Sequence, residues 1–577
     1  MTSAIITDNA EICWLPLPRF DSSAPFCTIL DDQKAGYFRI ELDSQREYKQ
    51  SYIAPNVLKT SIKTDNGECS IIDFLLLGEP RLIRELKSTV KIKLFIRPKF
   101  EYGKYEPKIE KRESGALFIN PNGGDAIELE IKDATILGYN GDTEWTLSPG
   151  IGRIILTYYP DYPRESDAKQ NAAVDSLLLD RTTSYWNSIL SKETAEEQVN
   201  LPTELPVEFK DLFVSSLSTV LGLMYGPSGG IIASPTTSLP ESVGGFRNWD
   251  YRYVWVRDAT MMAKALMSAG FKLQAGRTIT FLLNLISHSD KPFASIYTVG
   301  GLKPPPERQL FWLSGVANSK PVRVGNSAAL QTQLDIEGYF MDLFESYCRD
   351  AENLTFLKTN WSTINCIVAW ISENWQLSDS GIWEEPFPQE FTYSKAMMWV
   401  ALDRAIKLGK KLDIKLDNAE KAKADIRTWI FDNCIKDGAF VKTPYTNETD
   451  ASLLTLPLYG FIGLDEPIFL NTLNNIEKDL VVDGFVYRYK NYEIGKPSHQ
   501  FTLCSAWLSS VYAKMGRIDN AQTLIKNVSE LCGPLKLVGE HVDKDNKFFL
   551  GNFPQGFAHA GIINALIDIS NGMDGVG

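Results

Sequence analysis

The spacing of apolar residues divides the chain into two parts. Between residues 90 and 96 every second position is valine, leucine or isoleucine, and Pro98 ends the run, which predicts a β-strand with one buried face. Asp65-Asn66-Gly67 separates two further short runs and predicts a hairpin. Short runs of this kind, separated by Gly, Pro and Asn, predict an antiparallel β-sandwich for residues 1–173.

From residue 207 onwards the apolar positions recur at intervals of three and four, which predicts helices. Twelve segments fit this period: 207–225, 257–269, 272–288, 327–348, 354–376, 391–409, 417–434, 449–459, 467–478, 500–514, 518–532 and 556–571. Long and short connections alternate between them, as in an (α/α)6 barrel. In such a barrel the six long loops would meet at one rim and form one pocket, whereas an irregular helical domain would leave them unrelated. Residues 207–577 are therefore expected to form the barrel, and residues 174–206 a linker with one helix.

Composition narrows the class of protein. A chain of 577 residues predicts two or more domains, and a net charge of −13 argues against nucleic-acid and membrane partners. The N-terminus lacks the features of a secretory signal, and eight scattered cysteines without a CxxC pair are typical of reduced thiols in a cytoplasmic protein. A chain whose export signal was removed is the alternative. With four histidines, a histidine-based zinc site is not expected, and neither is any cofactor. Nothing in the sequence indicates an oligomeric state.

Residues 244–260, GGFRNWDYRYVWVRDAT, combine five aromatic side chains with three arginines and two aspartates. Aromatic faces beside fixed polar groups suit a sugar ring, which is apolar on its faces and hydroxylated at its rim. Arg257 and Asp258 lie where this segment turns helical, so we expect them at a helix start facing a pocket. A buried Arg–Asp pair that holds a loop is an equally good interpretation from chemistry alone.

Paired carboxylates are the second sign of sugar chemistry. Cleavage of a glycosidic bond needs one carboxylic acid to protonate the leaving oxygen, and a second carboxylate to attack the sugar or activate water. Glu384 and Glu385 follow Trp383 in a predicted long loop. Neighbouring glutamates point in different directions and so cannot share one role, and a nearby like charge would raise the pKa of one of them.

Three motifs resemble those of the glucoamylase and trehalase family of inverting glycoside hydrolases, in its prokaryotic, glucoamylase-like form. They are NWDYRYVWVRDA at residues 248–259, the Trp-Glu element at residue 383 and GNFPQGFAH at residues 551–559. The opening residues 13–32 also resemble the family's N-terminal sandwich domain. There Trp14, Arg19 and Phe20 could approach the active site, although a folded strand pair is the simpler expectation.

The resemblance implies roles for individual residues. Glu384 would be the general acid and Glu540 the general base, with Asp543 a distant second choice for the base. The substrate-binding residues would be Arg257, Asp258, Glu385 and Arg488, with Trp249, Trp255 and Trp383 as pocket walls. Gln331 and Gln333 could line the rim, but helix packing is the simpler role for both. His559 could border the pocket or lie in the core.

The implied activity is exo-acting, inverting hydrolysis of an α-glucoside without metal or cofactor. The carboxyl groups would then lie about 6.5–9.5 Å apart, with room for a water. Malto-oligosaccharides or α-glucans and α,α-trehalose are nearly level as substrates. The doubled glutamate favours glucans, and the apparent lack of an export signal favours a cytosolic disaccharide or stored glycogen. His499-Gln500 replaces a Glu-Gly pair of many relatives, which leaves a contact on the aglycone side in doubt. Two alternatives remain, a disaccharide phosphorylase of similar architecture and a non-catalytic sugar-binding protein.

Overall fold

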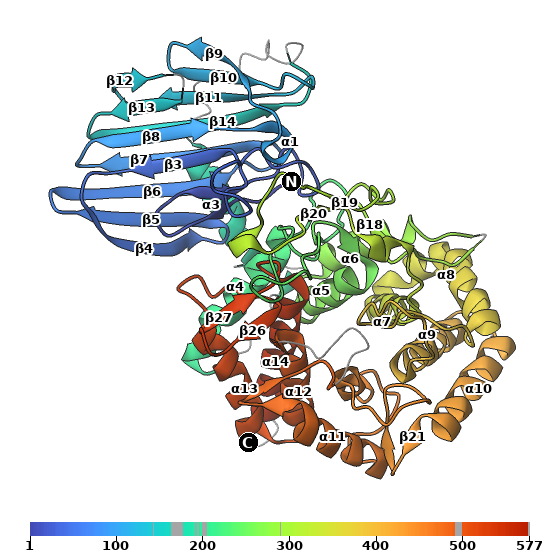
Figure 1. The fold of residues 1–577 in the computed structure, drawn as a ribbon. Helices are drawn as coiled ribbons and strands as arrows, with labels where there is room; N and C mark the ends of the chain where they lie inside the picture. Colours follow the sequence, from blue (N-terminus) through green and yellow to red (C-terminus); the bar gives the residue numbers. More distant parts are fainter. Residues whose placement is uncertain are drawn as a thin grey trace.

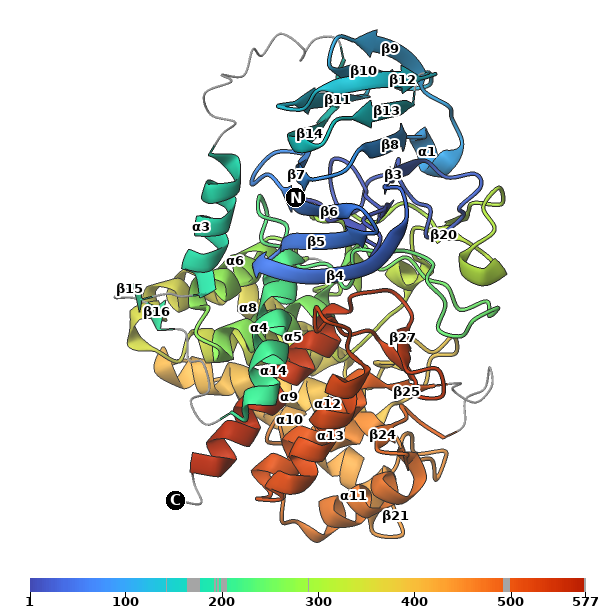
Figure 2. The same cartoon turned by 90° about the vertical axis from the view of Figure 1, so that its left-hand side faces the viewer.

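The computed structural model describes residues 1–141, 143–162, 177–190, 193–194, 197–198, 205–288, 290–490 and 499–574. A layered β-structure from the N-terminal part lies against a ring of helices from the C-terminal part (Figures 1 and 2). The predicted combination of an antiparallel β-sandwich and an (α/α)6 barrel is confirmed. The domain bounds 1–173, 174–206 and 207–577 stay a prediction.

Two antiparallel sheets form the sandwich. The six-stranded sheet has the order β1 (Ile5–Ile6), β2 (Ile12–Trp14), β3 (Tyr37–Glu41), β8 (Ile92–Arg97), β13 (Glu144–Leu147), β12 (Ile136–Asn140). The eight-stranded sheet has the order β4 (Gln45–Ala54), β5 (Val57–Thr64), β6 (Gly67–Leu75), β7 (Arg81–Ser88), β14 (Gly150–Tyr159), β11 (Ala126–Lys132), β10 (Gly115–Ile119), β9 (Lys108–Arg112). The apolar side of β8 is buried as its alternation predicts, and Thr64 pairs with Gly67 across the predicted hairpin.

The barrel consists of an inner and an outer ring of helices. The inner ring is α5 (Val256–Ser268), α7 (Ile336–Tyr347), α9 (Thr392–Lys411), the 3-10 helix η4 (Ala451–Thr455), α12 (Thr502–Lys514) and α14 (Gly556–Asp574), each in contact with the next and α14 with α5. The outer ring is α4 (Val207–Gly222), α6 (Lys272–Leu283), α8 (Leu354–Asn374), α10 (Asp417–Asn433), α11 (Pro467–Leu480) and α13 (Ile518–Leu531).

Inner and outer helices differ in how much of their surface is buried, as α12 and α13 show. The inner helix α12 is buried from Thr502 to Ala513, whereas the outer helix α13 buries Ala521, Leu524, Ile525 and Val528, which recur at helical spacing on one face. Each long connection leads from an outer helix to the N-terminus of the next inner helix. The long loops 223–255, 284–335, 375–391, 434–450, 481–501 and 532–555 therefore meet at one end of the barrel, as predicted.

Two of the predicted helices differ from the structure. The segment 327–348 is helical only from Ile336, because Ser327–Leu330 forms a 3-10 turn capped by the Asn326 side chain, and the side chains of Gln331 and Gln333 are bonded to the loop around Glu384. The segment 449–459 contains only the short 3-10 helix η4, in which Asp450 caps the backbone N–H of Ser452. In both segments the apolar residues recur at helical spacing, but hydrogen bonds from nearby backbone N–H groups to the Asn326 and Asp450 side chains favour a 3-10 turn there instead of an α-helix.

The helix predicted within the linker 174–206 is α3 (Leu178–Leu190), and residues 174–176, 191–192, 195–196 and 199–204 of that linker lie outside the described residues. Leu178 packs in one cluster with Val57, Phe74 and Ile83, so α3 lies against the eight-stranded sheet. All eight cysteines are free thiols. In the described residues, no helix has both the length and the apolar character needed to cross a membrane.

Candidate active site

A cavity of about 290 Å³ opens among the long loops, close to the lower end of the range for small-molecule sites, about 300 Å³. Its lining residues are Ala233, Glu241, Phe246, Arg247, Trp249, Tyr251, Trp255, Arg257, Asp258, Met261, Asn326, Ser327, Ala328, Gln331, Ile382, Trp383, Glu384, Pro386, Arg488, Tyr489, Phe501, Leu503, Glu540 and Phe557. In the described chain, five of the six long loops contribute to this lining, so the expectation that all six would do so is wrong. The cavity contains eight of the nine site residues predicted from the sequence, and the exception is Glu385.

Arg257 and Asp258 lie in the first turn of α5, where an aspartate is favoured by the helix dipole. Arg257 Nε donates to Asp258 Oδ1 at 3.1 Å, and its other nitrogens reach Gln333 Oε1, the carbonyl of Ile382 and Glu384 Oε1 at 3.1–3.2 Å. Burial raises the pKa of Asp258 to about 7, although Arg257 acts in the opposite direction. The pair both holds a loop and lines the cavity, so the two interpretations of it are compatible.

Glu384 lies on a tight turn with φ of 59°, a left-handed conformation that a glutamate rarely adopts. Its Oε1 accepts hydrogen bonds from Trp255 Nε1 at 2.6 Å, from Arg257 Nη2 at 3.1 Å and from Gln333 Nε2 at 3.2 Å. Trp255 is itself fixed, because its short strand β17 (Val254–Trp255) pairs with β18 (Ile296–Tyr297). Three donors on one oxygen hold the carboxylate in one orientation.

Glu540 precedes the short strand β26 (His541–Asp543), on a different loop. Its Oε1 accepts a hydrogen bond from the Tyr251 hydroxyl at 3.0 Å, and the Tyr251 ring meets the Trp255 ring edge-on at 5.5 Å. Tyr251 and Trp255 thus connect the two carboxylates from one wall of the cavity. Asp543 is absent from the lining; its carboxylate caps a turn at Asn546.

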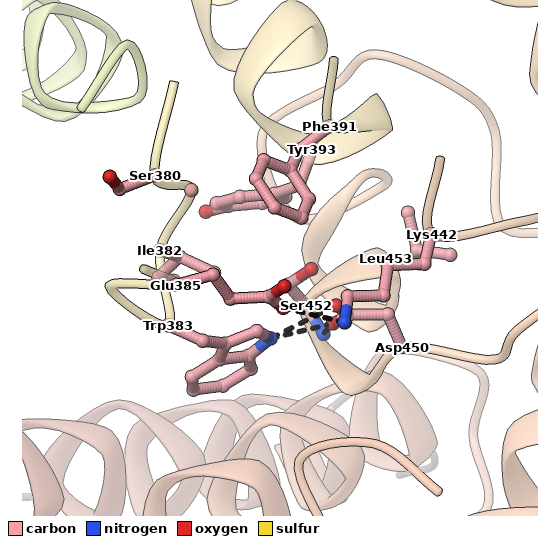
Figure 3. Close-up of a pocket in the computed structure, with 11 residues that line it drawn as sticks. Ser380, Ile382, Trp383, Glu385, Phe391, Tyr393, Lys442, Asp450, Ser452 and Leu453 are labelled. Carbon is pink, nitrogen blue, oxygen red and sulfur yellow. Dashed lines mark hydrogen bonds and ion pairs between the residues drawn. The ribbon is translucent and has the colours of Figure 1, made fainter. Parts of the chain in front are cut away.

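Trp383 lines both this cavity and a smaller one, whose lining residues are drawn in Figure 3. The indole Nε1 of Trp383 donates to both carboxylate oxygens of Asp450 at 2.9 and 3.0 Å. Glu385 lines the smaller cavity, where its carboxylate forms an ion pair with the buried Lys442 at 2.5 Å. Burial raises the pKa of both Glu385 and Asp450, against the lowering effect of Lys442. The resemblance implied substrate binding by Glu385; the structure places Glu385 in the lining of the smaller cavity, and its role stays a prediction.

Arg488 and Trp249 complete the predicted set. The guanidinium of Arg488 lies over the rings of Phe501, Tyr489 and Trp383 at 4.9–5.9 Å and pairs with Glu241 at 3.5 Å. Trp249 is held from behind by Arg323, whose guanidinium lies 4.4 Å from the ring centroid. Stacked arginine and tryptophan faces of this kind suit the face and rim of a sugar ring.

The sequence interpretation did not name three residues that lie at the site: Glu241, Tyr251 and His541. Tyr251 lies inside the 248–259 motif and His541 directly follows Glu540, so position along the chain could have indicated both. Gln333 was considered for the rim, with helix packing as the simpler role, and it bonds to Glu384 and Arg257. Glu241 carries no signal in the sequence apart from lying shortly before the motif. His559 is fully buried between the Val538 N–H and the Ser216 hydroxyl, which gives it a core role.

Comparisons with known proteins show which family and fold this chain shares. Residues 208–567 match the model of glycosyl hydrolases family 15, and residues 1–124 match that of a trehalase-like N-terminal domain. Trehalase 1 of Sulfolobus acidocaldarius is 40% identical over 99% of this chain and 97% of its own length, and Trehalase 2 of the same organism is 38% identical over 97% and 96%. A bacterial glucoamylase solved in complex with acarbose has the same fold, with a TM-score of 0.72 at 14% identity over 98% of this chain and 91% of that one.

Three lines of evidence therefore converge: the motifs, the two-part fold and the sequence likeness over nearly the full length. The family model covers more than half of the chain and includes every residue that lines the cavity. The chain is a glycoside hydrolase that belongs to glycosyl hydrolases family 15.

Proposed function

We propose that this enzyme hydrolyses α,α-trehalose, with inversion at the attacked carbon, to one β-glucose and one α-glucose. The observation that carries the proposal is the presence of Glu384 and Glu540, from two different loops, in one small cavity with the Arg257–Asp258 pair. The substrate assignment is supported by the two trehalases of Sulfolobus acidocaldarius, which align with nearly the whole chain.

In the proposed reaction Glu540 removes a proton from a water molecule as the water attacks C1. Glu384 gives its proton to the departing glycosidic oxygen on the opposite face of the ring. Because Oε1 of Glu384 already accepts three hydrogen bonds, its Oε2 is the oxygen that would carry the transferred proton. Tyr251 would hold Glu540 in the orientation needed to reach the water.

Binding of the glucose whose C1 is attacked is assigned to the polar groups of the same cavity. Arg257 donates and Asp258, with a pKa near 7, both donates and accepts at neutral pH, which matches sugar hydroxyls. Trp249, Trp255 and Trp383 form the walls and Arg488 closes one side. Side chains of the inner helices fill the barrel below the loops, so the cavity admits only a chain end, which supports exo action.

Hydrolysis of malto-oligosaccharides is the second candidate. The doubled glutamate at 384–385 was the sequence feature in its favour, since the second glutamate would contact the substrate. In this chain Glu385 is engaged with Lys442 behind Trp383, so that support is lost. The likeness to the bacterial glucoamylase concerns the fold alone.

The proposal is tested by following the product anomers with NMR for trehalose, maltose, maltotriose and soluble starch, each with and without phosphate. We expect trehalose to be preferred and to give α- and β-glucose in equal initial amounts without phosphate. Two α-glucose molecules would indicate retention, and preference for starch would indicate a glucoamylase. Glucose 1-phosphate formed only with phosphate would point to phosphorolysis and would contradict the role given to Glu540.

A further inference from the structure

Phe246 differs from the other aromatic residues that line the cavity, because it is 58% exposed. Each of the others is held by a second ring or by an arginine, as Trp249 is held by Arg323. Among the described residues, Phe246 has no such contact and belongs to none of the buried apolar clusters. A large apolar ring that lines a cavity but packs against nothing indicates a surface for a ligand.

Hydrogen bonds fix the backbone on both sides of Phe246. The Glu241 N–H donates to the carbonyl of Arg247 at 3.2 Å, which closes the loop 241–247. The carbonyl of Phe246 accepts hydrogen bonds from Arg323 Nη1 at 2.9 Å and from the Asn248 N–H at 3.1 Å. Since Arg323 belongs to the second long loop, these bonds also tie two loops together. The exposed ring is therefore carried by a fixed backbone, and a ligand that packs on it does not have to order the loop.

Exposure along the lining distinguishes the floor of the cavity from its mouth. Arg257 and Asp258, at the start of α5, are buried, whereas Phe246, Ser327 and Pro386 are exposed and come from the first three long loops. The floor therefore lies at the pair to which the proposed function assigns the glucose that is attacked. The sugar on the other side of the glycosidic bond must then extend towards the mouth, where Phe246 lies.

We propose that Phe246 is a specificity-determining residue that binds the leaving glucose; the inference rests on the proposed function. The ring packs against the apolar C–H face of that sugar, and this contact removes apolar surface of both partners from water. The sugar keeps this face while the glycosidic bond breaks, so the contact stabilises the bound substrate and the transition state to a similar extent. Loss of the contact should therefore raise KM and leave kcat nearly unchanged.

The test compares α,α-trehalose with α-D-glucosyl fluoride, whose leaving group is fluoride and places no sugar against Phe246. In the fluoride, water forms the new bond to C1 and fluoride departs with the electrons of the C1–F bond, so both substrates release β-glucose on inversion. For Phe246→Ala we expect KM for trehalose to rise about tenfold, while kcat for trehalose and kcat/KM for the fluoride stay within about threefold.

Two further variants serve as controls. Phe246→Tyr keeps an aromatic face at the same position and should stay close to the wild type on both substrates. Phe311→Ala truncates another exposed phenylalanine, on the second long loop and outside the cavity lining, and should change neither substrate. Because Phe246 is exposed, Phe246→Ala should fold and melt like the wild type.

The outcomes separate this inference from the proposed function. Equal losses of Phe246→Ala on trehalose and on the fluoride, or an unchanged KM for trehalose, would overturn the inference, whatever the wild type does. A wild type that prefers maltose would contradict the trehalose assignment, and the same comparison of maltose with the fluoride would then decide the role of Phe246. A wild type that hydrolyses neither disaccharide would overturn both proposals.

Discussion

Glu384 and Glu385 are adjacent in sequence but their carboxylates lie in different surroundings. Glu384 faces the larger cavity and is held there by Trp255, Arg257 and Gln333. Glu385 is buried behind Trp383 in an ion pair with Lys442. The left-handed backbone at Glu384 turns the two side chains apart. Sequence distance alone therefore says little about which glutamate touches the substrate.

Because the two carboxylates lie in different surroundings, we expect the same substitution, glutamate to glutamine, to have different effects at residues 384 and 385. Glu384→Gln removes the proton donor and should lower kcat by about 10²- to 10⁴-fold, the usual contribution of a general acid. Glu385→Gln leaves the cavity intact but weakens a buried charged contact, so it should lower kcat/KM by less than about tenfold and stability by about 1–3 kcal/mol. Steady-state kinetics and thermal melts of both variants test this. A larger loss of kcat/KM in Glu385→Gln than in Glu384→Gln would contradict the assignment.

At the scale of single elements, His559 on the last inner helix α14 makes the stability of the fold depend on pH. Burial lowers the pKa of His559 to about 3. The unfolded chain takes up this proton as pH falls through about 6.5, and the folded protein does so only near pH 3. Between these values the unfolded state binds more protons, so the contribution of His559 to stability is full above about pH 6.5 and is lost in acid, by about 1.4 kcal/mol per pH unit.

We therefore expect His559→Gln to weaken the response of the protein to acid. At pH 7.5 the variant should melt below the wild type, because at least one of the bonds to Val538 and Ser216 is lost. From pH 6.5 to 4.5 its Tm should fall less steeply than that of the wild type. His288→Gln, at an exposed position, should keep the wild-type slope. Parallel slopes for the wild type and His559→Gln would argue against a neutral buried imidazole.

The elements also differ in how far the sequence predicts them. Eleven of the twelve predicted helical segments contain an α-helix in the described chain, because a helix with one buried face leaves a clear period and a fully buried helix leaves a long run rich in apolar residues. The helix prediction was wrong for the first part of 327–348 and for 449–459, where the side chains of Asn326 and Asp450 accept hydrogen bonds from nearby backbone. The spacing of apolar residues does not reveal such local hydrogen bonds. Glu241 and Gln333 reach the site through tertiary contacts that leave no local pattern.

At the scale of the whole molecule, the sandwich is part of the support of the active-site loops. One buried cluster combines Trp14, Leu30 and Tyr102 from the N-terminal part with Leu239 and Leu313 from the first two long loops. Trp14 Nε1 donates to the carbonyl of Pro235 at 2.7 Å. From the other side, Arg252 Nη1 donates to the carbonyl of Ser22 at 2.6 Å. Loops that carry Glu241, Tyr251 and Trp255 are thus anchored on a separate layer of the protein.

Because the sandwich anchors the active-site loops through Trp14, we expect two tryptophan substitutions in the sandwich to differ in their effect on kcat/KM. Trp14→Ala and Trp145→Ala each remove a large buried ring and should destabilise by about 3–5 kcal/mol. Trp145 lies in the cluster between the two sheets, whereas Trp14 lies in the cluster shared with the loops. We expect Trp14→Ala to lower kcat/KM of the folded protein at least tenfold, and Trp145→Ala to leave it within about twofold, since a small displacement of positioned groups has large kinetic effects.

Activity per folded molecule, with the folded fraction taken from calorimetry, measures this difference. A common unfolding transition in calorimetry would accompany it, because the shared cluster couples the two parts. Equal kcat/KM for the two variants at matched folded fraction would show that the sandwich stabilises the chain without positioning the loops. A tenfold difference would instead mean that the N-terminal part acts on catalysis from outside the cavity, through the backbone at Pro235 and Arg252.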